Sequence, residues 1–475
     1  MTLEEILAVR PSPGRPRRYT FPEFDRTVLP SGMQLLTVHI PGRPLVSANL
    51  IVRRGAGDEP ADLAGATILA ARAMTEGTEH YPGVALTEAA ERLGATLNVD
   101  ASWDAVVASV EVAAPRLGAA LALLGELVER PTFPEADVAR LREERLNDLL
   151  QVMADSRRRV DRAFTATLYA PESPYSRPAA GDEASVPRLG VEALRGVHRT
   201  LLDPRRTAII VGGDVTTAQV LGALGSPLAH LGSSSRATAA PTSVAADVPS
   251  AASAVDHPIV RLYHRPGSVQ TELRIGHVGL ARRGPDFHAV QVMAAILGGL
   301  FNSRLQMNLR EEKGYTYGIG AGFDMRRGAG PFSVRTAVQT AATVPSITEC
   351  LSELRRIRET KVTETELAAA RDYLVGVFPL RFETPGAVVA ALDGLFIHEL
   401  PDDELARYRP AVEAVTIDAV QQAAQDHIHP DRLAIVAVGD ADVVAAELES
   451  AGFGELEVVT DEVPVESGEG EEAAD

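Results

Sequence analysis

An eleven-residue pattern occurs twice in this chain, and the distance between its copies limits the folds that the chain can adopt. Residues 204–214 read PRRTAIIVGGD and residues 430–440 read PDRLAIVAVGD, so the copies lie 226 residues apart. Each copy is an apolar run that ends in Gly-Asp, which predicts a buried strand followed by a turn. Copies so far apart indicate a duplicated domain of about two hundred residues rather than a short-period solenoid.

Each half combines pairs of strands with groups of helices. An amphipathic segment precedes each copy of the pattern and predicts helices at 191–202 and 417–428. Strands are predicted at residues 34–40, 46–52, 96–99 and 106–112. A long helix is predicted after Pro134, where apolar residues recur at helical spacing: Leu146, Leu149, Leu150 and Met153. Helices massed between pairs of strands favour two similar α+β domains.

Composition divides the chain into five parts. Residues 232–258 are rich in Ser, Ala, Thr and Pro and hold only three charged residues, a composition that builds no core. We therefore expect an N-terminal domain at 19–231 and a C-terminal domain at 259–455, joined by this linker. Residues 1–18 are predicted to be an N-terminal extension. Residues 456–475, which are strongly acidic and lack basic residues, are predicted to be a disordered tail.

The charge balance and the cysteine count exclude several classes of protein. The net charge is −19, whereas nucleic acids and anionic membranes bind clustered Lys and Arg, so neither is expected as a partner. Cys350 is the only cysteine, so no disulfide can form within the chain. The sequence has no apolar run long enough to span a membrane and no signal-peptide pattern near its start. We expect a cytoplasmic location.

The most informative motif is LREEKGYTYG at residues 309–318. It predicts a helix end, a turn at Gly314, and a strand that carries Tyr315 and Tyr317 on one face. Arg310 and Tyr317 would then lie side by side. A guanidinium and a phenol are donors that suit a peptide carbonyl or a developing oxyanion. The motif alone also allows a structural role, because a helix-end arginine complements the helix dipole and a strand tyrosine packs a sheet.

Together with LFNSRL at residues 300–305, this motif resembles the C-terminal signature of the pitrilysin or insulinase-like zinc peptidases, the inverted zincins. In that family an arginine and a tyrosine seven positions apart reach a zinc site and bind substrate, and Arg310 and Tyr317 keep that spacing. The resemblance extends over most of the chain, through residues 55–78, 174–178 (PYSRP) and 383–385 (ETP). It implies the pitrilysin/LuxS-like metallohydrolase fold, a clam-like pair of similar α+β domains that face each other across a chamber.

The expected chemistry depends on how the chain departs from the family. The family enzymes carry His-x-x-Glu-His on a helix, where two imidazoles one turn apart bind zinc and the glutamate acts as base. The matching residues here are Ile68, Leu69, Ala70, Ala71 and Arg72. None of them can bind zinc or activate water, and Gln151 stands where the third ligand, a glutamate, is expected. We predict no metal site and no catalytic residue in this chain alone.

Other residue types that could form a site are few. His427 and His429 are separated by one residue, but no cysteine lies near them to complete a ligand set, so metal binding there is not expected. Arg304 points to a different face from Arg310 and is predicted to form a structural ion pair. Trp103, the only tryptophan, lies in an acidic turn, and a partner interface stays open as its role.

The resemblance implies two functions of different classes. In the first, this chain is the non-zinc-binding subunit of a heterodimeric zinc metallopeptidase, related to mitochondrial processing peptidase. A zinc-bearing paralogous subunit holds the metal, and Arg310 and Tyr317 bind and orient a peptide or unfolded polypeptide at that zinc. In the second, the chain is a catalytically inactive scaffold, like the core subunits of the respiratory cytochrome bc complex. The retained Arg-Tyr spacing favours the first hypothesis.

Overall fold

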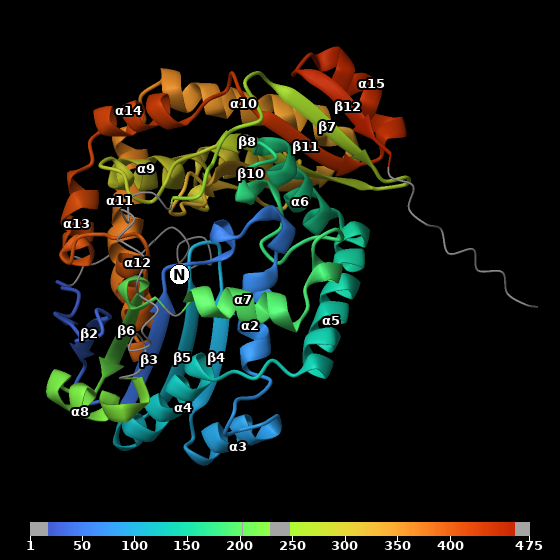
Figure 1. Cartoon of the computed structure of the whole chain (residues 1–475). Coiled ribbons are helices and arrows are strands. Elements are labelled where there is room, and N and C mark those ends of the chain that lie inside the picture. The colour runs from blue at the N-terminus through green and yellow to red at the C-terminus, as the bar shows by residue number, and fades with distance from the viewer. Residues whose placement is uncertain (1–17, 202, 229–247, 461–475) are drawn as a thin grey trace, which may run out of the picture.

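The computed structural model describes residues 18–201, 203–228 and 248–460, which form two six-stranded sheets covered by helices (Figure 1). The first sheet contains β1 (Asp25–Val28), β2 (Gln34–His39), β3 (Leu45–Val52), β4 (Thr96–Ala101), β5 (Val106–Ala113) and β6 (Thr207–Gly213). The second contains β7 (Ile259–His264), β8 (Gln270–Val278), β9 (Ile319–Phe323), β10 (Pro331–Gln339), β11 (Ala434–Gly439) and β12 (Glu455–Val459). The predicted α+β class is confirmed.

The two sheets repeat one arrangement. The strand order is β1-β2-β6-β3-β5-β4 in the first and β12-β7-β11-β8-β10-β9 in the second. Asn49 on β3 lies opposite Ile210 on β6, and Arg274 on β8 lies opposite Val436 on β11. Equivalent residues are therefore 225 or 226 residues apart, as the repeated sequence pattern predicts.

One edge of each sheet breaks this repeat. β1 pairs antiparallel with β2, whereas β12 pairs parallel with β7. The prediction that a disordered tail begins at residue 456 is therefore wrong, because residues 455–459 complete the second sheet. Residues 461–475 of that predicted tail lie outside the described part of the chain, as do residues 1–17 of the predicted extension.

The helices follow the same repeat. The first half contains α2 (Ala66–Met74), α3 (Val84–Arg92), α4 (Leu117–Glu129), α5 (Glu135–Ala154), α6 (Ser156–Leu168), α7 (Val191–Leu201) and α8 (Thr217–Leu228). The second half contains α9 (Phe287–Ala294), α10 (Thr343–Glu359), α11 (Glu364–Val377), α12 (Pro385–Ile397), α13 (Glu404–Ala414), α14 (Ile417–His427) and α15 (Ala441–Ala451). The predicted helices at 191–202 and 417–428 correspond to α7 and α14.

Helix α5 exists as predicted, but of the four apolar residues at helical spacing only Leu149 is buried. The buried residues are Val138, Leu141, Leu149 and Val152. Leu150 is 70 % exposed and Met153 is 37 % exposed. The helix carries two apolar stripes at the same spacing, and the periodicity alone does not say which stripe meets the core.

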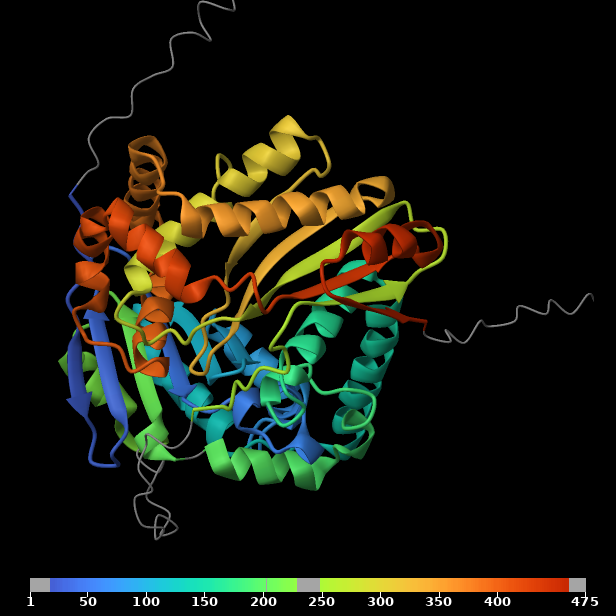
Figure 2. The ribbon, with the colours of Figure 1, turned by 90° about the horizontal axis from the view of Figure 1, so that it is seen from above.

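Each half supplies one helix to the sheet of the other half. Helix α6 packs on β8 and β11 of the second sheet, and helix α12 packs on β3 and β6 of the first. On β11, Ile435 and Ala437 face the second domain's own core, while Val436 and Val438 face α6. Figures 1 and 2 show α10 across the opposite face of that sheet. The central strands are buried on both faces, which accounts for their continuous apolar sequences.

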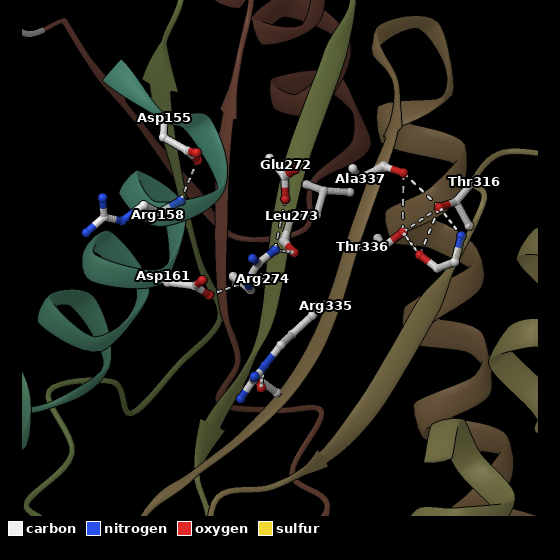
Figure 3. Close-up of polar contacts among 12 residues, drawn as sticks. Asp155, Arg158, Asp161, Glu272, Leu273, Arg274, Thr316, Arg335, Thr336 and Ala337 are labelled. Atoms are coloured by element: carbon white, nitrogen blue, oxygen red, sulfur yellow. Dashed lines mark hydrogen bonds and ion pairs between the residues drawn. The ribbon is translucent and has the colours of Figure 1, made fainter. Parts of the chain in front are cut away.

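A polar contact fixes each exchanged helix at an equivalent position. Asn49 on β3 donates from Nδ2 to Oδ2 of Asp393 on α12 at 2.6 Å. Its equivalent, Arg274 on β8, donates from Nε to Oδ1 of Asp161 on α6 at 2.6 Å (Figure 3). Burial raises the pKa of Asp393 to about 7, and the hydrogen bond from Asn49 opposes that shift.

Part of the predicted linker belongs to the packed structure. Val255 is 4 % exposed in the cluster that joins α6 to the second sheet, and Ser253 forms a bridge with Tyr169. Residues 232–247 of the predicted linker lie outside the described residues. Within the described residues no single helix is both long and apolar enough to cross a membrane; the only pair that qualifies jointly, Glu364–Phe382 with Pro385–Ile397, is bent by 114°.

The buried carboxyl of Asp393 makes stability depend on pH. Because its folded pKa of about 7 lies above the ordinary value of 3.8, its contribution is complete below about pH 4 and is lost as the pH rises through 7. Asp393→Asn keeps the acceptor for Asn49 without the charge. We expect the variant to be more stable than the parent at pH 8 by a few kcal/mol, since one pKa unit corresponds to about 1.4 kcal/mol.

Urea unfolding at pH 5 and pH 8 measures this difference, which should shrink at the lower pH. Asp161→Asn is the matched control, because Asp161 is half exposed and pairs with the charged Arg274. It should not raise stability at either pH. An Asp393→Asn variant that is no more stable than the parent at pH 8 would contradict the raised pKa of Asp393.

Candidate functional site

The positions that match the zinc motif lie on α2. Ile68 and Arg72 are one turn apart on the less buried face of this helix, whereas Ala71 is 1 % exposed in the core of the first domain. Nη2 of Arg72 lies 2.9 Å from Oε2 of Glu144 on α5. A guanidinium paired with a carboxylate therefore occupies the face where a metal would need imidazole ligands.

The pair belongs to a larger ion network. Arg140 donates to Glu144 at 2.7 Å and lies 2.8 Å from Glu76. The hydrogen bond from Arg140 lowers the pKa of Glu144, with Arg72 adding to the effect. The acidic residue that faces α2 is thus Glu144 and not residue 151. Gln151 lies seven residues further along α5 and lines an open cleft of about 870 Å³ at the junction with the turn after β7. Residues 144 and 151 are seven apart and share one face of the helix. This spacing is the only sequence signal that points to Glu144 as an alternative to Gln151.

The Arg310 motif begins with an uncommon helix geometry. A π-helix, η8 (Ala295–Gly299), follows α9, and a second, η9 (Gln306–Glu312), carries Arg310. Such turns are rare and occur frequently at functional sites. Gly298 is needed because a Cβ there would lie 2.5 Å from the amide nitrogen of Ala321 on β9, so its role is close packing. Gly314 adopts φ of 66° where η9 ends, which confirms the predicted turn.

The two tyrosines precede the strand that was predicted to contain them. β9 begins at Ile319, and residues 315–318 form a loop held by Thr316. Oγ1 of Thr316 donates to the carbonyl of Ala337 at 2.7 Å and accepts from Thr336 and from the Gly318 amide (Figure 3). The Thr316 hydroxyl thus bonds to backbone groups that would otherwise pair between neighbouring β-strands. The loop is fixed against β10, and Tyr317 points outward, 93 % exposed.

Arg310 is only partly engaged. Its guanidinium lies 4.8 Å from the ring centroid of Phe301, and its Nε lies 3.4 Å from a carboxylate oxygen of Glu311. Its side chain is 37 % exposed. Among the described residues the Tyr317 hydroxyl has no hydrogen-bond partner, and the side chains of Arg310 and Tyr317 do not bond to each other. The structure places both on one surface segment without the direct pairing that the sequence suggested.

Arg304 has the structural role predicted for it. It is 7 % exposed, and its Nε lies 2.6 Å from Oε1 of Glu366 on α11. Burial alone would raise the pKa of Glu366, but Arg304 and the hydrogen bonds from Thr363 hold it at about 2. This ion pair ties the start of the Arg310 helix to α11.

His427 and His429 contact different partners in the structure. His427 bonds to Asp286, whereas the ring of His429 lies 4.9 Å from that of His277. A further group of possible ligands in the described residues, His264 with Asp440 and Asp442, lies at the start of α15. Asp440 caps this helix and accepts hydrogen bonds from the amides of Asp442 and Gly267. Those oxygens already serve the backbone.

Two family models match the sequence. Residues 34–182 match the model described as Insulinase (Peptidase family M16), and residues 188–374 match the model described as Peptidase M16 inactive domain. The two matches meet near the end of the first half and together cover most of both domains.

Curated relatives include both peptidases and a non-peptidase by name. The chain is 24 % identical to an uncharacterized zinc protease of Streptomyces coelicolor, over 84 % of this chain and 86 % of the relative. It is 23 % identical to the non-peptidase homolog YmxG of Helicobacter pylori, over 72 % of this chain and 76 % of the relative.

Solved structures share the fold. The peptidase M16 inactive domain from Pseudomonas fluorescens superposes with a TM-score of 0.80 at 23 % identity, covering 88 % of this chain and 98 % of the other. A protease from Helicobacter pylori superposes with a TM-score of 0.78 at 16 % identity, covering 89 % and 100 %. At these identities the likeness establishes the architecture alone.

The two arginines of the motif should respond differently to removal. Arg304→Ala leaves Glu366 partly buried without its partner and should lower the free energy of unfolding by on the order of 2 kcal/mol. Arg310→Ala, the matched control, removes a half-exposed side chain and should change it by less than about 0.5 kcal/mol. Chemical denaturation of both variants measures this. Equal losses would show that Arg310 is a structural residue too.

The α2 face should not retain a transition metal. After exposure to zinc and gel filtration, the isolated chain should carry far less than one zinc per molecule, because Arg72 and its carboxylate partner replace the ligand set. Elemental analysis measures the content. If the parent chain holds one zinc tightly, the Glu144→Gln variant locates it. Zinc that persists in the variant would reveal a site elsewhere, and zinc that is lost would show that the ion network around Glu144 binds metal.

Proposed function

Because the chain belongs to the insulinase (M16) peptidase family and lacks its zinc-binding side chains, we propose that it is the non-zinc-binding subunit of a heterodimeric zinc metallopeptidase. The partner is a paralogous subunit that carries His-x-x-Glu-His. This chain contributes Arg310 and Tyr317, which bind and orient a peptide or unfolded polypeptide at the partner's zinc.

The observation that carries the proposal is the contrast between two surfaces of the same chain. At α2 the ligand positions are occupied by Ile68 and Arg72, and Arg72 is committed to Glu144. At the other surface, the phenol of Tyr317 is fully exposed on a loop that Thr316 holds in place. A donor that is rigidly mounted and has no partner within the described chain is suited to binding something outside it.

The chemistry expected of these two side chains is recognition of the peptide backbone. Zinc in the partner would polarise the carbonyl and the attacking water. Arg310 offers a planar fork of N–H donors, and Phe301 supports one face of its guanidinium so that the N–H edges can meet a carbonyl or carboxylate oxygen. Tyr317 offers one O–H donor. Together they would hold an extended substrate in register, which is a positioning role.

A second chain is needed because the two domains of this one are packed directly against each other. The exchanged helices α6 and α12 each pack on the sheet of the other half, and Tyr317 in the Arg310 segment stays 93 % exposed within the chain. A chamber that closes over this segment therefore requires another polypeptide. We propose the cytoplasm as the site of this assembly, in keeping with the absence of disulfides from a chain with one cysteine.

The alternative is an inactive scaffold or binding protein of the same fold. The ion network around Arg72 and Glu144 supports it, because both side chains already have partners within the chain. The relative called a non-peptidase homolog is of the same kind by name. In a scaffold, changes at Arg310 and Tyr317 would have no effect on any peptidase activity.

Reconstitution distinguishes the two functions. The chain is mixed with a His-x-x-Glu-His relative from the same genome, and hydrolysis of a fluorogenic unstructured peptide is followed. Arg310→Ala or Tyr317→Phe should lower kcat/KM by about tenfold or more, since removal of one positioned donor costs up to about 10²–10³. Tyr373→Phe, an exposed tyrosine on α11, is the matched control and should leave activity unchanged.

Gel filtration of each mixture shows whether the subunits still assemble. Loss of activity with intact assembly supports the substrate-binding role. Full activity of both variants would favour the scaffold.

A further inference from the structure

The tip of the β9–β10 hairpin, residues 324–330, reaches out of the second domain and into the first. Arg326, Gly328 and Gly330 within it are buried. The residues that surround it come from three segments of the first domain: Asp58, the turn between β4 and β5, and the segment after α6. A short, charged hairpin is thus enclosed by residues far from it in sequence.

Arg326 is clamped between two aromatic rings. Its guanidinium lies 4.7 Å from the ring centroid of Trp103 and 4.7 Å from that of Tyr175. The two rings are 5.2 Å apart and nearly perpendicular. Asp324 on the same hairpin lies 2.6 Å from the guanidinium. The planar cation therefore meets two π faces and one carboxylate, an arrangement that suits arginine better than lysine.

The hairpin backbone is also held by the first domain. The amide of Arg327 donates to Oδ2 of Asp104 at 2.9 Å, and the amide of Gly328 donates to the Tyr175 hydroxyl at 3.2 Å. The Tyr169 hydroxyl donates to the carbonyl of Ala329 at 3.0 Å. A Cβ at residue 328 would lie 2.6 Å from the carbonyl oxygen of Pro249, so the fit requires glycine.

The contacts of the hairpin tip are more polar than those of the exchanged helices, although Tyr169 and Tyr175 also belong to the apolar cluster around α6. Helices α6 and α12 are joined to the opposite sheets mainly by apolar clusters, with one polar contact each, Arg274–Asp161 and Asn49–Asp393. The hairpin tip is joined by cation–π contacts, hydrogen bonds and the Arg327–Asp58 ion pair, and it connects β10 to the edge strand β9. Residues 324–330 lie outside the register of β9 with β10 and of β10 with β8, so separation of the tip would leave those strand pairs intact.

We infer that residues 324–330 form an interdomain latch, clamped at Arg326 by Trp103 and Tyr175, that opens locally while the two domains stay joined by their exchanged helices. Opening releases the outer end of β9, the edge strand that begins two residues after Tyr317. The latch therefore controls how firmly the Tyr317 surface is positioned relative to the first domain. The latch itself does not depend on the proposed function.

The chain's single tryptophan makes the latch measurable without any partner. In Arg326→Gln, the tryptophan emission should shift to longer wavelength, and acrylamide should quench it more strongly, because Trp103 becomes accessible. Trypsin cleavage after Arg327 should become about tenfold faster. Cleavage follows the population of the open form, and loss of a desolvated cation–π contact should raise that population by about this factor. Arg326→Lys keeps the charge without the planar group and should give an intermediate rate.

The matched control is Arg335→Gln on β10, an exposed arginine that bonds to Ser333 on its own strand. It should change neither the emission nor the cleavage rate. Hydrogen exchange of β3 and β11, measured in parallel, should stay at the parent level in every variant. Unchanged emission and cleavage in Arg326→Gln would overturn the latch, as would faster exchange in β3 and β11, which would show that the hairpin opens only when the domains unfold.

Discussion

The structure depends on the exchange of one helix between its two domains. Each sheet has a face that its own domain does not cover, and α12 or α6 from the other domain fills it. Removing either helix would expose the apolar residues of two central strands, so neither half can complete its core alone. The exchange also fixes the orientation of the sheets, and with it the surface on which the Arg310 segment is displayed.

Much of this architecture is readable from the sequence, but the exchange is not. The pattern at residues 204–214 and 430–440 predicts the duplication, and β6 and β11 are buried on both faces as their apolar runs suggest. Periodicity does not identify which neighbour covers a face, so α6 and α12 could not be assigned to the opposite sheets. For the same reason the spacing of apolar residues on α5 does not identify its buried stripe. Trp103, for which the sequence leaves a partner interface open, packs within the chain on Arg326.

Some features of the candidate site can be predicted from the sequence, and others cannot. Residue types and spacing are sufficient to predict that α2 lacks zinc ligands, that Arg304 forms an ion pair and that the chain turns at Gly314. The loop geometry depends on a hydroxyl that bonds across to β10, which is a tertiary contact with no local pattern. Thr316 thus keeps Tyr317 out of the strand and turns it to solvent, a result that favours an external ligand over packing.

The account rests on the claim that Arg310 and Tyr317 act on a substrate held by another chain. The most direct measurement is an electron cryo-microscopy structure of the chain with a zinc-bearing relative whose catalytic glutamate is replaced, in the presence of a long unstructured peptide. The account predicts peptide density that runs from the partner's zinc to within hydrogen-bond distance of the Arg310 guanidinium and the Tyr317 hydroxyl. A complex in which both side chains face away from the bound peptide would contradict it.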